Sequence, residues 1–166
     1  MKRVKSILCD EEYQTRIHEI EAKEVTRRFC RHGLEHLMAV ARIAYIINLE
    51  ESCGLSRELI YAAALLHDIG RCTPEEDSGV GHRAAGVAYA TRILRRCDFS
   101  EDEISAVIAA VEHHGAAAEA AEAGDLAGLI YRADKLSRDC AGCGAYDECN
   151  WDVKLKGRLR DRDIIY

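Results

Sequence analysis

Apolar residues recur along most of the chain at steps of three and four positions, which is the period of an α-helix with one buried face. No segment shows the strict alternation that predicts a half-buried β-strand. We therefore expect an all-α protein, folded as a compact bundle of helices. The pattern places these helices over residues 11–30, 34–49, 56–69, 82–96, 100–114 and 125–138.

Polar residues mark several of the helix ends. Ser100 and Glu103 have the spacing of a capping box, in which each side chain bonds to the other residue's backbone N–H group. Ser56 and Asp125 are suitable caps for the helices that follow them. The segment from Arg31 to Gly33 is expected to separate the first two helices. Surface loops are expected over 71–81 and 115–124, the second alternatively as a short polar helix.

Histidine residues lie on the inward faces of two of these helices. His36 shares an apolar stripe with Val40 and Ile43, and His67 shares one with Ile60. A single histidine on such a stripe is more often a hydrogen-bonded core residue than a metal ligand. His67, however, is followed directly by Asp68, and a buried carboxylate without a partner costs several kcal/mol. A metal ion would remove that cost.

Further histidines and an aspartate follow in the sequence. Asp134 shares a helix face with Ile130, although a salt bridge with Arg132 or Arg138 would also explain it. His114 lies on the buried stripe of its helix, whereas His113 lies about 100° away from that stripe. Taken together, the residues predict a metal site with the candidate ligands His36, His67, Asp68, His82, His113, His114 and Asp134.

Mixed imidazole and carboxylate ligands suit a divalent transition metal. We expect one or two ions, with Fe or Mn favoured and Zn, Ni or Mg as alternatives. His32 lies four residues before His36 and would extend the site if the helix continued through Gly33. Arg71 and Lys135 are the nearest cations to the ligands in sequence, and Arg71 would serve either as a phosphate clamp or as a helix C-terminal cation.

Composition limits the other functions. The 166 residues fit one domain with a sizeable core, and the net charge of −6 with no long basic run argues against general nucleic-acid binding. No apolar stretch is long enough to cross a membrane, and no export signal is evident, so a cytoplasmic location is expected. The sequence leaves the oligomeric state open, with a homodimer as one option.

Three of the eight cysteines form a cluster near the C-terminal end. Cys140, Cys143 and Cys149 have the spacing C-x2-C-x5-C, which suits a structural Zn²⁺ ion or an iron–sulfur cluster. A fourth ligand is not identified by the spacing. The alternative is a glycine-rich turn whose thiols pack as small apolar groups. We expect residues 1–139 to form the helical domain and 140–166 to form a cysteine-containing tail packed on it.

The order of His36, His67-Asp68 and Asp134 resembles the HD superfamily of metal-dependent phosphohydrolases. The resemblance spans about residues 30–138, and the whole chain is similar to small, stand-alone bacterial HD hydrolases. It implies that these four residues hold one metal ion. It also implies that Asp68 bridges to a second ion, whose ligands are His82 and one or both of His113 and His114.

The resemblance implies hydrolysis by metal-activated water, with Asp68, Arg71 and Lys135 as residues of the catalytic machinery. The expected substrate is a small phosphorylated metabolite, in particular a nucleotide. Two other functions use the same ligands. One is a di-iron oxygenase of the HD fold, and the other is a non-catalytic sensor of metal or nucleotide. The complete set of ligands favours an enzyme.

Overall fold

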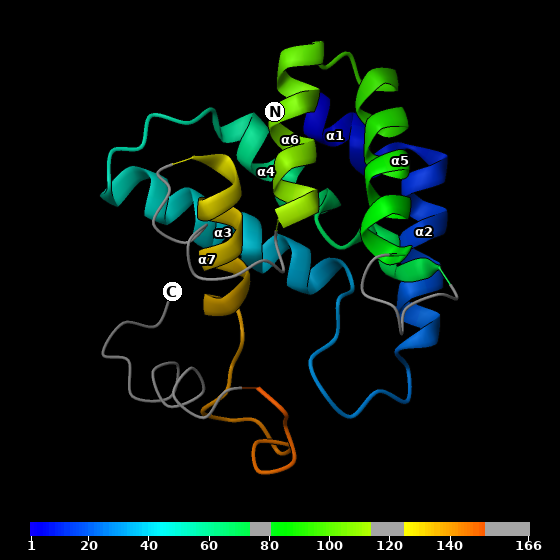
Figure 1. The fold of residues 1–166 in the computed structure, drawn as a ribbon, viewed down its shortest axis with the longest axis vertical. Helices are drawn as coiled ribbons and strands as arrows, with labels where there is room; N and C mark the ends of the chain where they lie inside the picture. Colours follow the sequence, from blue (N-terminus) through cyan, green and yellow to red (C-terminus); the bar gives the residue numbers. More distant parts are fainter. Residues whose placement is uncertain (74–80, 114–124, 152–166) are drawn as a thin grey trace.

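The computed structural model describes residues 1–73, 81–113 and 125–151, and for His113 the backbone alone. Within these residues the chain forms helices and turns without a β-strand, which confirms the all-α fold (Figure 1). The helices are α1 (Lys2–Cys9), α2 (Glu11–Lys23), α3 (Leu34–Glu50), α4 (Arg57–Leu66), the 3-10 helix η1 (Ile69–Cys72), α5 (Gly81–Arg96), α6 (Glu101–His113) and α7 (Leu126–Leu136).

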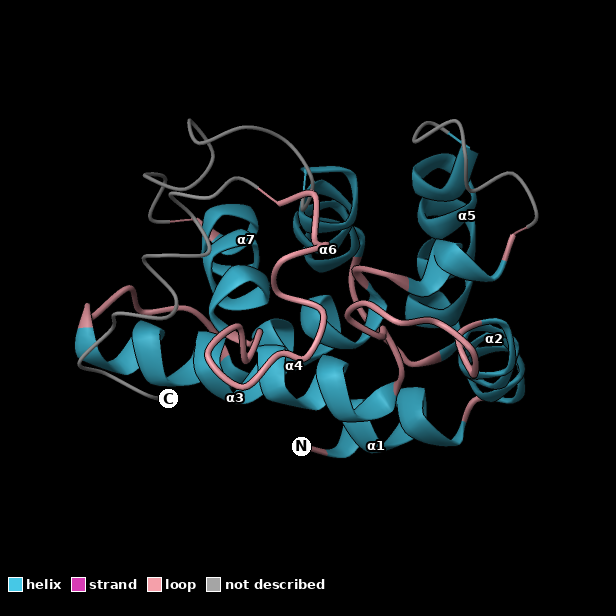
Figure 2. Ribbon diagram, turned by 90° about the horizontal axis from the view of Figure 1, so that it is seen from below, coloured by secondary structure: helices cyan, strands magenta, loops and turns pink. Residues whose placement is uncertain are grey.

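Helix α4 is the centre of the core. It packs against α1, α3, α6 and α7, while α5 packs against α6 and η1. Figure 2 shows α1, α3 and α4 along one side of the molecule and α5, α6 and α7 on the other. The five residues from Ala62 to Leu66 are all fully buried. A helical stretch that is buried on every side is stable only when other elements surround it, and here the neighbours of α4 do so.

The end of α4 places two candidate ligands inside the protein. The sequence predicted that this helix continues to Ile69, but it ends at Leu66 with His67 as the C-cap. Asp68 then leaves helical geometry, and η1 continues the chain as a tighter turn. His67 and Asp68 are both buried because this change of direction takes place within the core.

The first predicted helix was wrong in its extent. Residues 2–9 form a separate helix, α1, and Asp10 caps α2 by accepting a hydrogen bond from the backbone N–H of Tyr13 at 3.1 Å. Helix α2 ends at Lys23, so residues 24–33 form a loop, which we call the 24–33 loop. The helix-favouring charges of this stretch predicted a longer helix, but Glu24 instead binds His32 within the loop.

The three residues predicted to cap helices lie at helix N-termini in the structure. Ser100 and Glu103 form the reciprocal capping box, with bonds of 2.9 and 3.3 Å. Asp125 caps α7 through the backbone N–H of Gly128 at 2.8 Å. Ser56 occupies the N-cap position of α4 without a capping side-chain hydrogen bond. Helix α7 ends at Leu136, two residues before the predicted end.

Gly70 allows the chain after His67-Asp68 to lie directly against α5. A Cβ atom at Gly70 would overlap the backbone carbonyl oxygen of His82 and would lie 2.7 Å from the backbone nitrogen of Gly86. Both contacts are with backbone atoms, which cannot turn aside as a flexible side chain can. The close approach therefore depends on the absence of a side chain at position 70.

We expect Gly70→Ala to lower the free energy of unfolding by about 3 kcal/mol, because overpacking at a backbone contact forces α5 away from η1. Gly144→Ala is the matched control, since a Cβ atom there would meet nothing within 4 Å. Urea denaturation of the two variants measures the difference. Equal unfolding free energies for the two variants would contradict the prediction, because they would show that α5 and η1 can move apart without loss of stability.

Candidate metal centre

Four predicted ligands from three parts of the chain meet in the core. His36 lies on α3, His67 and Asp68 follow α4, and Asp134 lies on α7. The Nε2 atom of His36 is 3.2 Å from Asp134 Oδ1 and 3.8 Å from Asp68 Oδ2. The Nε2 atom of His67 is 3.2 Å from Asp68 Oδ2 and 3.9 Å from Asp134 Oδ1. We call these four residues the His/Asp cluster.

Three members of the His/Asp cluster are close enough to share one ion. Ligand atoms of His36, His67 and Asp134 all lie within 4.8 Å of one another. Asp68 is not part of that group of three, although its Oδ2 atom lies near both histidine rings. Two imidazoles and two carboxylates form a ligand set that fits a divalent transition metal.

Hydrogen bonds fix the orientation of the His67 ring. Its Nδ1–H group donates to the backbone carbonyl oxygen of Ala64 at 2.8 Å, because a carbonyl oxygen can only accept. Its Nε2 atom therefore faces the carboxylates. Burial alone would lower the pKa of His67, but Asp68 and Asp134 together outweigh burial and raise it. The two carboxylates thus favour positive charge at the position where a metal would bind.

The His36 ring is held from a different side. The hydroxyl group of Ser137 donates to the backbone carbonyl of Asp134 at 2.7 Å, so it accepts from His36 Nδ1–H at 3.2 Å. Burial, opposed in part by Asp134, lowers the pKa of His36 to about 4, so this ring is neutral at neutral pH. Its Nε2 lone pair accepts from Arg138 at 3.0 Å. Both histidines therefore direct Nε2 inward, as metal-binding histidines with a second hydrogen bond do.

Three cations surround the two carboxylates. Arg71 Nε donates to Asp68 Oδ1 at 2.7 Å, and Lys135 Nζ donates to Asp134 Oδ2 at 2.8 Å. Arg138 Nη2 donates to Asp134 Oδ1 at 3.0 Å. Burial tends to raise the pKa of Asp134, but the two histidines together with Lys135 and Arg138 hold it well below its usual range. Both predicted catalytic cations, Arg71 and Lys135, thus contact metal-ligand candidates directly.

His32 lies beside the cluster in an unusual setting. Both oxygens of the buried Glu24 carboxylate bind it, one to its backbone N–H and one to its ring Nδ1, each at 2.6 Å. Its ring centroid is 5.7 Å from that of His36. Gly33 is the N-cap of α3, so His32 is not one helical turn before His36 as a continuous helix would require. Its position comes from the 24–33 loop.

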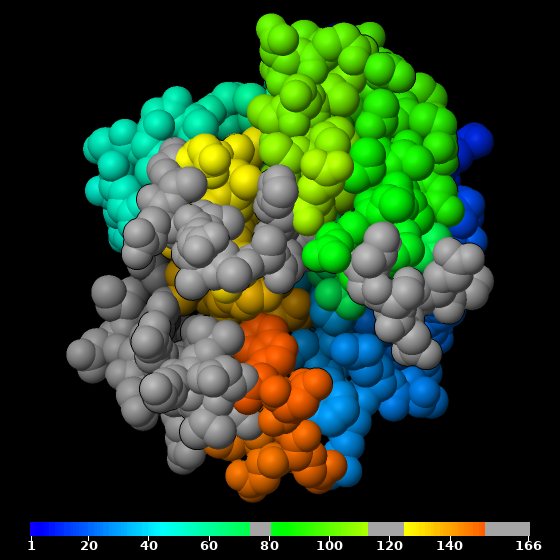
Figure 3. Space-filling model, in the orientation of Figure 1, coloured from blue at the N-terminus to red at the C-terminus, as the bar shows by residue number. Residues whose placement is uncertain are grey.

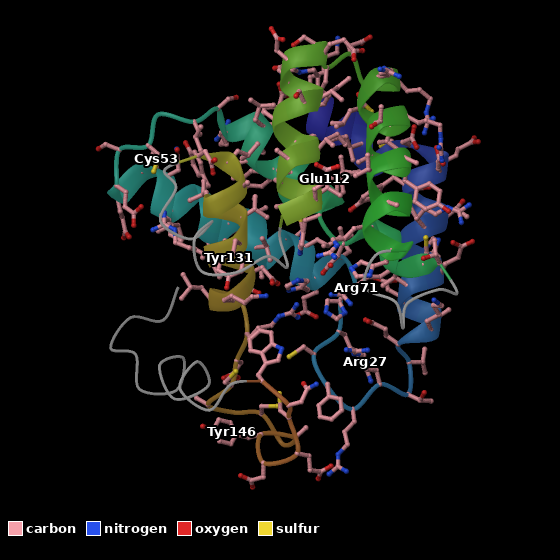
Figure 4. The ribbon with its side chains drawn as sticks, in the orientation of Figure 1. Arg27, Cys53, Arg71, Glu112, Tyr131 and Tyr146 are labelled. Carbon is pink, nitrogen blue, oxygen red and sulfur yellow. The ribbon has the colours of Figure 1, made fainter. Side chains whose placement is uncertain are left out.

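A cavity of about 360 Å³ opens beside the cluster. Asp134 and His32 line it, together with four cations: Arg27, Arg71, Lys135 and Arg138. Phe29 and Trp151 supply aromatic surface, and Lys135 Nζ lies 5.0 Å from the centre of the Trp151 ring system. Figure 4 shows Arg71 and Arg27 in the same region, between the helices and the 24–33 loop. The cavity suits an anion that carries an apolar or aromatic group.

The structure describes the side chain of only one of the three other predicted ligands, His82. His82 lies in the first turn of α5, and its backbone, through the contact with Gly70, is held near the chain that follows Asp68. It is not in the group whose ligand atoms lie within 4.8 Å of one another. His113 ends α6, but its side chain and the whole of His114 lie outside the described residues. Their predicted role stays a prediction.

Sequence reasoning missed Glu24 and Ser137 and gave Arg138 only the role of a salt-bridge partner. Glu24 falls among the charged residues of the helix predicted over 11–30, yet it is 5% exposed. Arg138 forms the predicted salt bridge with Asp134 but also contacts His36 Nε2. Arg138 follows Asp134 by four residues, a spacing that places both side chains on one helix face and could have indicated a place for Arg138 beside the metal site. For Ser137 and Glu24 no spacing rule exists, because their partners lie on other elements or in an irregular loop.

Comparison with known proteins shows the family to which this chain belongs. The family model described as HD domain matches residues 33–139, a range that contains the whole His/Asp cluster. The chain belongs to the HD-domain family. Proteins of this family bind divalent metals and are in general hydrolases. The match begins at the N-cap of α3 and ends three residues after α7.

The curated proteins that are similar to this HD-domain chain include the following two. An uncharacterized protein of Clostridium beijerinckii is 40% identical over 156 residues, which cover 94% of this chain and 96% of the relative. A bifunctional uridylyltransferase/uridylyl-removing enzyme of Cereibacter sphaeroides is 31% identical over 97 residues, or 58% of this chain and 9% of that enzyme. No solved structure matches. No helix among the described residues is long and apolar enough to cross a membrane.

Proposed function

We propose that this HD-domain protein is a metal-dependent phosphohydrolase that acts on a small phosphorylated metabolite, with nucleotides as the favoured substrates. The observation that carries the proposal is the position of the cavity. Asp134 belongs to the His/Asp cluster and also lines the cavity. Arg71, Lys135 and Arg138 line the cavity too, and each donates a hydrogen bond to a carboxylate of the cluster. A phosphate ester bound by these cations would therefore lie next to the ion held by the cluster.

One set of residues would bind the metal, and another would bind the phosphate group of the substrate. His36, His67, Asp68 and Asp134 would hold the metal, which, when bound, activates water for attack on phosphorus and neutralises phosphoryl charge. Arginine side chains are suited to phosphate because their N–H groups match two oxygens at once. Arg27 also lines the cavity, where its Nε atom lies 3.8 Å from the Glu24 carboxylate, and it would orient the substrate anion. Arg71 and Arg138 would bind phosphate while keeping Asp68 and Asp134 in place.

Two observations favour a nucleotide. Trp151 and Phe29 line the cationic cavity, and aromatic rings stack on nucleobases at about 1–3 kcal/mol per base in nucleic-acid complexes. The Cereibacter relative is named for removing uridylyl groups, which are nucleotides joined through phosphate. This chain corresponds to only 9% of that enzyme, so the whole enzyme's substrates are not carried over.

Elemental analysis and a phosphate-release screen test the proposal together. Protein purified without chelators is expected to contain Fe or Mn and to hydrolyse nucleotides faster than sugar phosphates that lack a base. The His67→Ala/Asp68→Ala variant is expected to lose both the metal and the activity. His18→Ala, a change of an exposed histidine on α2, is expected to lose neither. Metal binding without turnover, or O₂ consumption without phosphate release, would contradict the proposal.

A further inference from the structure

The 24–33 loop and the residues after α7 lie side by side. Figure 1 shows them as the blue loop and the orange segment at one end of the molecule, and Figure 3 shows their surfaces in contact. Arg28 pairs with Glu148 at 2.5 Å, and Arg138 donates to the carbonyl oxygen of Arg31 at 3.1 Å. We call residues 137–151 the C-terminal segment. These contacts join two segments that are far apart in sequence, since Arg31 and Arg138 are separated by 107 positions.

This contact brings a fourth cysteine to the three of the C-x2-C-x5-C motif. Cys30 and Cys149 line the same cavity, one from each segment. Burial raises the pKa of the Cys140 thiol, and the nearby thiols of Cys30, Cys143 and Cys149 raise it further. The other four cysteines belong to other parts of the fold, at the end of α1, after α3, in η1 and after α5: Cys9, Cys53, Cys72 and Cys97.

Tight turns hold the three cysteines of the motif. The Asp139 carboxylate accepts from the backbone N–H of Gly142 at 3.0 Å, which closes the turn between Cys140 and Cys143. The backbone N–H of Tyr146 bonds to the carbonyl oxygen of Cys143 at 3.2 Å, and that of Cys149 bonds to Ala145 at 3.0 Å. Such turns keep thiols of one segment within reach of a single ion.

We propose that Cys30, Cys140, Cys143 and Cys149 bind a Zn²⁺ ion that ties the 24–33 loop to the C-terminal segment. Four thiolates are a closed ligand set typical of structural zinc. The positive ion offsets the cost of four ionised thiols at one place. Among the described residues, the group whose ligand atoms all lie within 4.8 Å of one another is His36, His67 and Asp134, and the four cysteines do not form such a group. Their sulfur atoms would therefore move closer together when zinc binds.

This ion would act on the cavity beside the His/Asp cluster without touching the substrate. The 24–33 loop carries Arg27 and His32, and the C-terminal segment carries Arg138 and Trp151, all of which line that cavity. Zinc would therefore fix two walls of the cavity relative to each other. The two metal sites would be separate, with sulfur ligands at one and nitrogen and oxygen ligands at the other.

Zinc content of the full-length protein tests the proposal. Cys30→Ser and Cys143→Ser are each expected to lose one equivalent of zinc, while Cys53→Ser, a half-buried cysteine of a distant loop, retains it. The His67→Ala/Asp68→Ala variant is also expected to retain it. Zinc retained in Cys30→Ser would overturn the assignment of the fourth ligand, and iron with sulfide would overturn the assignment of zinc.

Cobalt substitution of the wild-type protein gives a second readout that does not depend on variants that fold. Co²⁺ bound by thiolates has a sulfur-to-metal charge-transfer band in the near ultraviolet, whereas Co²⁺ bound by the His/Asp cluster has none. We expect this band in the wild type and in Cys53→Ser. Its absence from the cobalt-loaded wild type would overturn the proposal, whatever the outcome for the phosphohydrolase.

Discussion

Asp134→Asn is expected to remove the metal from the His/Asp cluster and to lower the rate of hydrolysis by about 1000-fold. The change keeps the shape of the side chain but removes the charge that faces both histidines. A catalytic metal contributes several kcal/mol to transition-state stabilisation, and about 4 kcal/mol corresponds to this factor. Metal content and the rate of phosphate release at saturating substrate measure the effect.

The matched control for this variant is Asp102→Asn. Asp102 lies exposed in the first turn of α6, where loss of its charge weakens the helix by a few tenths of a kcal/mol. Both variants remove one carboxylate charge, so a general effect of net charge would appear in both. Normal metal content and activity in Asp134→Asn would rule out the His/Asp cluster as the catalytic metal site.

Arg138→Met is expected to destabilise the metal-free protein by about 3 kcal/mol and the metal-loaded protein by much less. The Arg138 side chain is 7% exposed and donates to both His36 Nε2 and Asp134 Oδ1. Removing one partner of a buried ion pair leaves the other charge uncompensated, which costs about 3–5 kcal/mol. A divalent ion bound by the same two atoms would supply the missing positive charge.

Thermal unfolding with and without added metal measures this difference. The stabilisation by metal is expected to be larger in Arg138→Met than in the wild type. Arg132→Met is the control on the same helix, because Arg132 pairs with the largely exposed Glu51, and such pairs contribute about 0–1 kcal/mol. An equal loss of stability with and without metal would mean that Arg138 has a purely structural role.

These two expectations depend on different kinds of information. The importance of Asp134 could be predicted from its sequence order with His36 and the His67-Asp68 pair. The role of Arg138 at His36 could not, because the two residues are 102 positions apart and meet only when α3 packs against α7. Side-chain contacts between distant elements depend on packing, which helical periodicity does not describe.

The same contrast applies to the loop before α3. Charged residues with good helix propensity extend beyond Lys23, and propensity alone predicted one helix to residue 30. The structure ends α2 at Lys23, and Glu24 turns inward to bind His32. Tertiary contacts outweigh propensity here, because a buried carboxylate with two hydrogen bonds to one residue favours a conformation that an isolated helix could not adopt.

The sequence by itself determined the helical class, the caps at Ser100 and Asp125, and the inward faces of His36 and His67, because helical period and capping are local properties of the chain. Tertiary structure decided which of these faces meet. It joined His36, His67, Asp68 and Asp134, placed the cationic cavity beside them, and brought Cys30 to the C-terminal segment. The physical reason is that burial of apolar helix faces fixes the arrangement of the helices and loops, and this arrangement sets the distances between residues far apart in sequence.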